Sequence, residues 1–217
     1  MVRLGAVAVV VMLLLRAKSV EQTTNAVRML GRLAIDDTQS KQITQQGSIP
    51  YLVALLKTGT GDQKCWAAFT LRKVTACEAN RDEIVREGAI PPLVALLRGL
   101  NEELNTSVVR ALGNLTTTDA HRAELSREGA IPPLVELLRK GSDELKKHTL
   151  RALGNLATDD AYRAQMAQEK AIPALISLLR TGGEAHKPNA ARTPELWKYR
   201  LFIDCKVLDE NNQLLQS

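Results

Sequence analysis

The chain has 217 residues, of which 45% are hydrophobic, 24% are charged and only 3% are aromatic. This apolar content excludes a disordered chain, and a core of Leu, Ala, Val and Ile with so few aromatic residues indicates helices rather than a β-sandwich. The three cysteines are too few for a disulfide framework, so we expect a reducing compartment, the cytoplasm or the nucleus. The net charge of +5 is a mild basic excess that does not by itself imply nucleic acid.

The first element in chain order is an apolar run over residues 4–15, between Arg3 and Arg16. The run is too short to span a bilayer as a helix, which needs about 20 residues. A cleaved signal peptide is the alternative, because small residues follow at Ala17 and Ser19. The repeat described next favours a helix of the fold, since the run has the pattern of segments that recur later without any targeting role.

Four similar segments start at positions 47, 88, 129 and 170, a constant step of 41 residues. The best-formed copies read GAIPPLVALLR from Gly88 and GAIPPLVELLR from Gly129. A second pattern, ALGNL, keeps the same step at Ala111 and Ala152. Periods in the low forties are typical of helical solenoids or of propeller blades, and the short strands and regular aromatic residues of blades are missing here.

Each repeat divides into three helices. In the best-formed copy, Asp119 can cap a first helix that Gly129 ends, because glycine tolerates the left-handed conformation. Two prolines open a second helix, which stops at Gly141, and Ser142 or Asp143 caps the third. One such unit cannot bury its apolar stripe alone, so neighbouring units must stack on both sides.

The repeat predicts an array over residues 1–192 and a divergent tail over 193–217. The array begins at a second helix, and its units lie near 5–46, 47–87, 88–128 and 129–169, with a partial unit over 170–192. Pro194 falls where the register predicts leucine inside a third helix, and such a proline costs about 3 kcal/mol or more. The tail is either a capping helix or a sequence unconnected with the fold, and the missing first helix points to a longer parent protein.

The GAIPPLV second helix, the ALGNL third helix and the period resemble the armadillo repeat family over roughly residues 4–192. The array is similar to those of β-catenin, vacuolar armadillo proteins and U-box ubiquitin ligases. The resemblance implies an all-α fold, a right-handed superhelix of about four to five three-helix repeats whose third helices line a concave groove. In the family this groove binds an extended peptide, and the third-helix Asn typically bonds to the peptide backbone.

One face of each third helix is polar and cannot be the packed face. In the third copy, Glu103, Ser107, Arg110 and Asn114 share this face. The same face can be located in the other copies from the 41-residue step. Together the copies give the candidate groove residues Arg28, Arg32, Trp66, Phe69, Lys73, Arg110, Asn114, Arg151 and Asn155. Five of these nine are cations, so the groove resembles the basic groove of β-catenin more than that of importin-α, where Trp recurs.

We therefore expect a non-catalytic scaffold that binds an extended acidic protein segment, because Arg favours carboxylates and phosphates. Simpler interpretations of the groove remain open. The cations can be solvated or can pair along the helix with Glu103 or Glu144, and Trp66 and Phe69 can be core fillers.

Motifs of catalysis and cofactor binding are missing from the sequence. It has no phosphate-binding glycine motif, its three histidines are scattered over different repeats, and no cysteine pair has zinc spacing. The sequence predicts no enzyme activity, no cofactor, no metal and no transmembrane segment. The alternative function is the substrate-binding part of a larger U-box-type ubiquitin ligase. Nucleic-acid binding is less favoured, because the groove has few aromatic residues for stacking.

Overall fold

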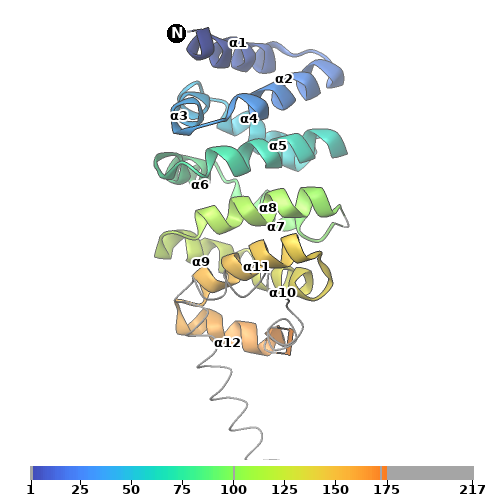
Figure 1. The fold of residues 1–217 in the computed structure, drawn as a ribbon, viewed down its shortest axis with the longest axis vertical. Coiled ribbons are helices and arrows are strands. Elements are labelled where there is room, and N and C mark those ends of the chain that lie inside the picture. Colours follow the sequence, from blue (N-terminus) through green and yellow to red (C-terminus); the bar gives the residue numbers. More distant parts are fainter. Residues whose placement is uncertain (1, 100, 172, 175–217) are drawn as a thin grey trace, which may run out of the picture.

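The computed structural model describes residues 2–99, 101–171 and 173–174, and all their regular elements are helical (Figure 1). The expected third helix of the partial fifth unit and the tail over 193–217 lie outside the described residues. A pair of helices opens the chain, α1 (Val2–Arg16) and α2 (Val20–Leu33).

Three units of one design follow this pair. The first contains α3 (Asp37–Gln45), α4 (Ile49–Thr58) and α5 (Gly61–Val74). The second contains the 3-10 helix η1 (Glu78–Asn80), α6 (Arg81–Arg86), α7 (Ile90–Leu96) and α8 (Glu102–Leu115). The third contains α9 (Asp119–Arg127), α10 (Ile131–Lys140) and α11 (Asp143–Leu156), and α12 (Asp160–Gln168) begins the next. The third helices α2, α5, α8 and α11 start at 20, 61, 102 and 143, so the step of 41 residues is confirmed.

The helix caps keep the same step. The side chains of Ser19, Thr60, Asn101 and Ser142 each accept a hydrogen bond from a backbone N–H in the first turn of a third helix. The expectation that Asp119 caps α9 is wrong. Thr118 is the extended residue whose hydroxyl accepts the bond from the His121 N–H, so Asp119 becomes the first helical residue.

First helices end at a left-handed residue in every unit. Gly47, Gly88 and Gly129 have φ values of 73°, 74° and 71°, as expected of a glycine that follows a helix. Lys170 occupies the fourth of these positions with φ of 57°, which costs a residue with a Cβ more than it costs glycine.

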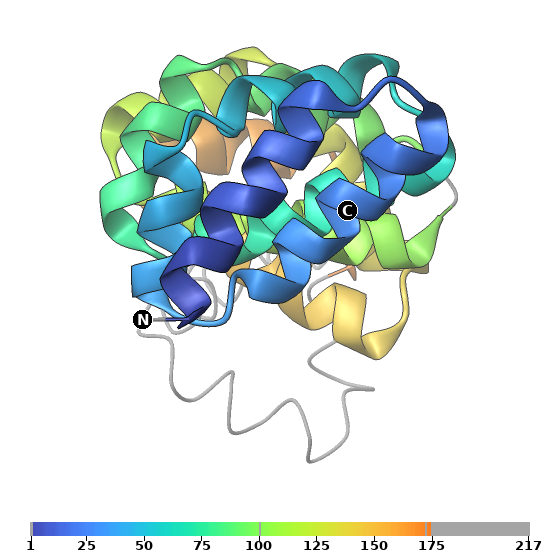
Figure 2. The same cartoon turned by 90° about the horizontal axis from the view of Figure 1, so that it is seen from above.

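The core runs along the stack instead of lying at one centre. α2 packs on α5, α5 on α8, and α8 on α11, and successive units overlie one another when the stack is viewed end-on (Figure 2). The apolar N-terminal run belongs to this core, because Val7, Val10 and Val11 of α1 are buried against the rest of the fold. Within the described residues, no helix is long and apolar enough to cross a membrane.

Candidate functional site

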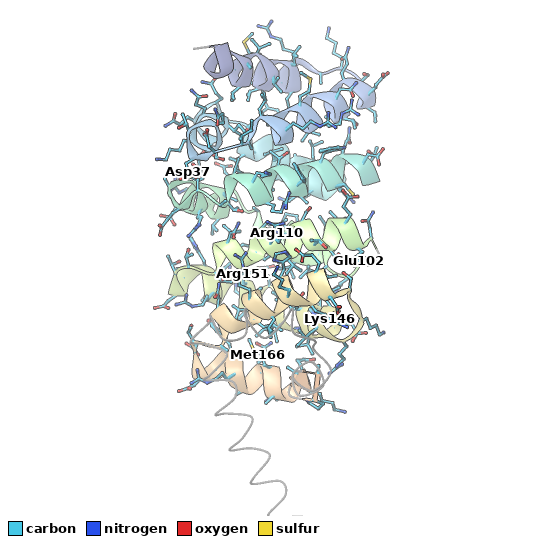
Figure 3. The ribbon with its side chains drawn as sticks, viewed as in Figure 1. Asp37, Glu102, Arg110, Lys146, Arg151 and Met166 are labelled. Carbon is cyan, nitrogen blue, oxygen red and sulfur yellow. The ribbon has the colours of Figure 1, made fainter. Side chains whose placement is uncertain are left out.

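A cavity of about 360 Å³ opens along the third helices. Its lining residues come from the connection between α2 and α3, from the first part of α3, from the end of α5 and the turn after it, and from α8 and α11. Its polar lining residues are Asp36, Asp37, Ser40, Arg72, Lys73, Arg110, Asn114, His148 and Arg151. We call this the groove cavity. Figure 3 shows Arg110 on α8 and Arg151 on α11, close together on the same face of the stack.

The groove cavity brings together four of the predicted site residues, namely Lys73, Arg110, Asn114 and Arg151. The other five, which are Arg28, Arg32, Trp66, Phe69 and Asn155, do not line it. Arg28 and Arg32 are exposed on α2, and Arg28 donates to the Asn25 side chain at 2.7 Å. The predicted face is therefore present along the stack, but its polar groups converge between α5 and α11.

The two aromatic residues form a half-buried pair on α5. The Trp66 and Phe69 rings meet edge to face with centroids 5.5 Å apart. Arg32 lies 5.8 Å from the Trp66 ring, and Arg72 lies 4.5 Å from the Phe69 ring. Trp66 also packs against the core. Trp66 therefore packs inward in part, while the faces of both rings lie near cations.

The third-helix asparagines bond to the preceding repeat. The side-chain N–H groups of Asn114 donate to the Thr75 hydroxyl at 3.2 Å and to the Arg72 carbonyl at 3.4 Å. Those of Asn155 donate to the Thr116 hydroxyl at 2.7 Å and to the Gly113 carbonyl at 3.2 Å. In this structure, these amide donors hold the end of the preceding third helix, instead of pointing freely into the groove as the resemblance implied.

Several other arginines are also used by the fold. Arg81, Arg122 and Arg163, again 41 residues apart, donate to carbonyls that follow the preceding third helix, those of Thr75, Thr116 and Ala157. These bonds satisfy acceptors that a helix end leaves open. The sequence analysis did not single out these three arginines, although their spacing equals the period of the repeat and could have identified them.

Among the described residues, neither Arg110 nor Arg151 donates to a backbone carbonyl in this way. Arg151 donates from Nη2 to Asn114 Oδ1 at 3.0 Å, and no carboxylate of the described residues lies within 4.0 Å of either guanidinium. The alternative pairing with Glu103 or Glu144 does not form among the described residues, and Glu144 contacts Lys147 and His148 instead. Burial lowers the pKa of Arg151, and the nearby charges of Arg110 and Arg81 lower it further.

Arg72 is the main residue of the cavity that the sequence analysis missed. It occupies the ALGNL glycine position in its copy, where Gly31 and Gly113 stand one repeat before and after. Its Nε is buried without a hydrogen-bond partner in the described part of the chain. Burial lowers its pKa, and so does the charge of Arg110. The departure from glycine was the available signal.

Comparison with known proteins identifies the fold. The family described as "Armadillo/beta-catenin-like repeat" matches residues 77–117 and 118–158. These two segments hold η1 to α8 and α9 to α11, so each begins at a first helix. Residues 77–158 thus contain two armadillo repeats, and the stack has the armadillo-repeat fold.

The armadillo chain is also similar to solved structures of designed proteins. A computationally designed armadillo protein for modular peptide recognition is 28% identical, with a TM-score of 0.79, over 86% of this chain and 80% of that chain. A designed armadillo protein in complex with the peptide (KR)4 is 27% identical, with a TM-score of 0.77 and the same coverage. An engineered protein is 25% identical, with a TM-score of 0.78, over 97% of this chain and 91% of that chain. No curated protein matches the sequence.

Metal-binding chemistry finds no support in the described part of the armadillo array. No group of three or more His, Cys, Asp or Glu side chains there is placed to hold a metal ion. The guanidinium groups of the groove cavity have paired N–H donors, which in general recognise carboxylates and phosphates.

His148 is the group in the groove cavity from which we expect a pH dependence of folding stability. Its side chain is 13% exposed and bonds to Glu144 at 2.8 Å. Burial is the largest cause that lowers the pKa of His148, and Arg110 and Arg151 lower it as well, whereas the bond to Glu144 raises it. The net direction is down, so the imidazole is neutral at pH 7.

We expect the folding stability to fall as the pH drops from about 7.5 to about 5.5. The unfolded chain takes up the His148 proton near pH 6.5. The stability that the lowered pKa of His148 contributes is therefore fully present above about pH 6.5. It is lost as the pH falls through the lower pKa of the folded state. Urea unfolding at both pH values measures the change, which should shrink in His148→Gln. An NMR titration that gives the folded imidazole an ordinary or raised pKa would contradict the expectation.

Glu144 acts in a separate pH window. The bond from His148 is the largest cause that lowers the pKa of this carboxyl. The stability that the Glu144 carboxyl contributes is present above the pKa of about 4.3 that the group has in the unfolded chain, and it is lost below that pH.

Proposed function

We propose that this armadillo array is a non-catalytic scaffold that binds an extended acidic segment of another protein along its third helices. The observation that carries the proposal is the excess of unpaired cations in the groove cavity. Arg72, Arg110 and Arg151 lie on three successive third helices, and no carboxylate of the described chain pairs with them at 4.0 Å or less. Like charges this close repel one another, so an anionic ligand would stabilise them.

The aromatic pair extends the same surface toward α2. Trp66 and Phe69 present ring faces to Arg32 and Arg72, in a half-buried position. Aromatic residues and arginines on one surface are typical of the residues that dominate binding energy at protein interfaces. A segment that crosses from the aromatic pair to Arg151 would pass over α5, α8 and α11.

The designed armadillo protein that was solved with (KR)4 holds a basic peptide. The cations in the present groove favour a ligand of opposite sign. We place such binding in the cytoplasm or the nucleus, in keeping with the three cysteines. A substrate-binding array of a larger U-box ligase would use the same groove, and a longer transcript that encodes a U-box upstream would favour that function.

Charge reversal tests the proposal. Two immobilised degenerate peptide pools are compared, one with glutamate and one with lysine at alternate positions. We expect the protein to retain the glutamate pool, and the double variant Arg110→Glu, Arg151→Glu to bind it at least about tenfold more weakly, because a tenfold loss corresponds to about 1.4 kcal/mol.

The control is the double variant Lys41→Glu, Lys57→Glu, which changes the net charge equally. Both lysines are exposed and neither lines the groove cavity. An equal loss in both double variants, or equal retention of the two pools by the native protein, would rule out a specific acidic site.

A further inference from the structure

Three guanidinium groups share the groove cavity at one place. Arg72 comes from α5, Arg110 from α8 and Arg151 from α11, and the charge of Arg110 lowers the pKa values of both other side chains. We call these three residues the arginine cluster. The charge of Arg110 lowers the pKa of Glu144, but the oxygens of Glu144 contact His148 and Lys147 instead of an arginine of the cluster. The cluster is therefore a concentrated positive charge that the described chain leaves unbalanced.

Arg72 makes this charge a feature of this chain rather than of its repeat. The other described copies have glycine at this position, Gly31, Gly113 and Gly154. In place of that glycine, Arg72 buries a donor, Nε, that no acceptor of the described residues satisfies. A buried donor without a partner destabilises a fold, and a second guanidinium beside it adds repulsion. Both costs are relieved if an anion binds there.

The donors of the cluster are partly oriented in advance. Arg151 is held by its bond from Nη2 to Asn114 Oδ1 at 3.0 Å, and Asn114 is itself tied to α5 through Thr75. Arg72 is held over the Phe69 ring at 4.5 Å. Arg110 has no hydrogen-bond acceptor among the described residues, so its fork is free. Two fixed guanidinium groups and one adaptable one suit an anion with several oxygens.

We infer that the arginine cluster is a subsite for a phosphorylated side chain, phosphoserine or phosphothreonine, of the segment that binds in the groove. This inference rests on the proposed function for the rest of the ligand. A phosphoryl group carries nearly two negative charges and three acceptor oxygens, whereas a carboxylate carries one charge and two oxygens. Three converging guanidinium groups match a phosphoryl group better than a carboxylate.

The same cavity suits single-stranded nucleic acid less well than a phosphorylated side chain. The rings of Trp66 and Phe69 do not line the cavity, so bases have nothing to stack on there.

Inorganic phosphate tests the cluster independently of any peptide. The probe is the NMR signals of the arginine Nε–Hε groups, assigned by substitution, during titration with phosphate and with chloride at equal ionic strength. We expect a saturable shift of the Arg72 and Arg110 signals with phosphate only, and a rise in the pKa of His148 as positive charge nearby is neutralised. If phosphate and chloride act alike, the inference is overturned, whatever peptides bind.

Three degenerate peptide pools then connect the subsite to the groove. The pools carry phosphoserine, glutamate or serine at one fixed central position, in the same acidic background. We expect phosphoserine peptides to bind at least about tenfold more tightly than serine peptides and severalfold more tightly than glutamate peptides. Arg110→Gln and Arg72→Gly should each remove this preference, and Lys57→Gln should preserve it. Arg72→Gly restores the glycine that the other repeats have at this position, so loss of folding would not explain its effect on binding.

The outcomes separate the two proposals. Equal binding of the phosphoserine and glutamate pools overturns the inference and leaves the acidic-peptide function standing. A specific phosphate response without binding of any acidic pool supports the anion subsite and contradicts the peptide function. Tighter binding of a single-stranded oligothymidylate than of the phosphoserine pool would overturn the inference in favour of nucleic acid.

Discussion

Asn114→Ala is expected to lower the free energy of unfolding by about 2 kcal/mol, because it leaves buried groups without hydrogen-bond partners. Asn114 donates to Thr75, which is fully buried after the end of α5, and accepts from Arg151. Truncation therefore breaks the link between α5 and α8 and also releases the guanidinium of Arg151. Urea unfolding monitored by circular dichroism measures the change.

Lys73→Ala is the matched control, because Lys73 occupies the same position one repeat earlier. Its ammonium lies 5.9 Å from the Phe69 ring and makes no ion pair at 4.0 Å or less with the described residues. We expect Lys73→Ala to lower the free energy of unfolding by about 0.5 kcal/mol. Equal stability of the native and Asn114→Ala proteins would show that the amide is free for a ligand, as the family resemblance first implied.

Gly31→Ala is expected to cost about 2 kcal/mol through overpacking between α2 and α5. A Cβ at this position would lie 2.7 Å from the Thr70 hydroxyl and 2.9 Å from Cδ1 of Phe69. Thr70 is fully buried and its hydroxyl bonds to the Trp66 carbonyl at 2.8 Å, so it has little room to move. The higher helix propensity of alanine offsets about 1 kcal/mol of a larger steric cost.

Gly113→Ala is the control at the same repeat position. Its Cβ would meet Nη2 of Arg151 at 3.3 Å, the far end of a flexible side chain, and Ala152 at an ordinary 3.6 Å. We expect a change within about 0.5 kcal/mol, because the propensity gain balances a small displacement. Thermal unfolding of both variants compares them, and equal losses would show that the close contact at Gly31 does not limit how tightly α2 and α5 pack.

The two pairs of variants divide the polar face of the third helices into structural and open positions. At one repeat position, the side chains of Asn114 and Asn155 bond to the preceding unit. At another, the side chains of Arg110 and Arg151 line the groove cavity. Arg81, Arg122 and Arg163 serve the fold as well. The net charge of +5 therefore does not tell how many of the cations are available to a ligand.

The local elements followed from the sequence because short-range chemistry decides them. Capping residues, positive-φ glycines and helix-opening prolines act within a few residues of their own position, so the period of 41 predicted the helices from α3 to α11. The cap of α9 shifted by one residue, to Thr118, since neighbouring Thr and Asp can each fill that role. The apolar N-terminal run was assigned to the fold by register alone.

The functional site depended on contacts between units, which the spacing along the chain does not specify. The sequence by itself determined the helices, the stack and the face that carries Arg110 and Arg151. Only the tertiary structure decided that the Asn114 amide is used by the preceding repeat, that Arg72 joins the groove cavity, and that no described carboxylate pairs with the arginine cluster. The physical reason is that hydrogen bonding and charge balance are settled by distances of a few ångströms across helix interfaces, where residues about 40 positions apart meet.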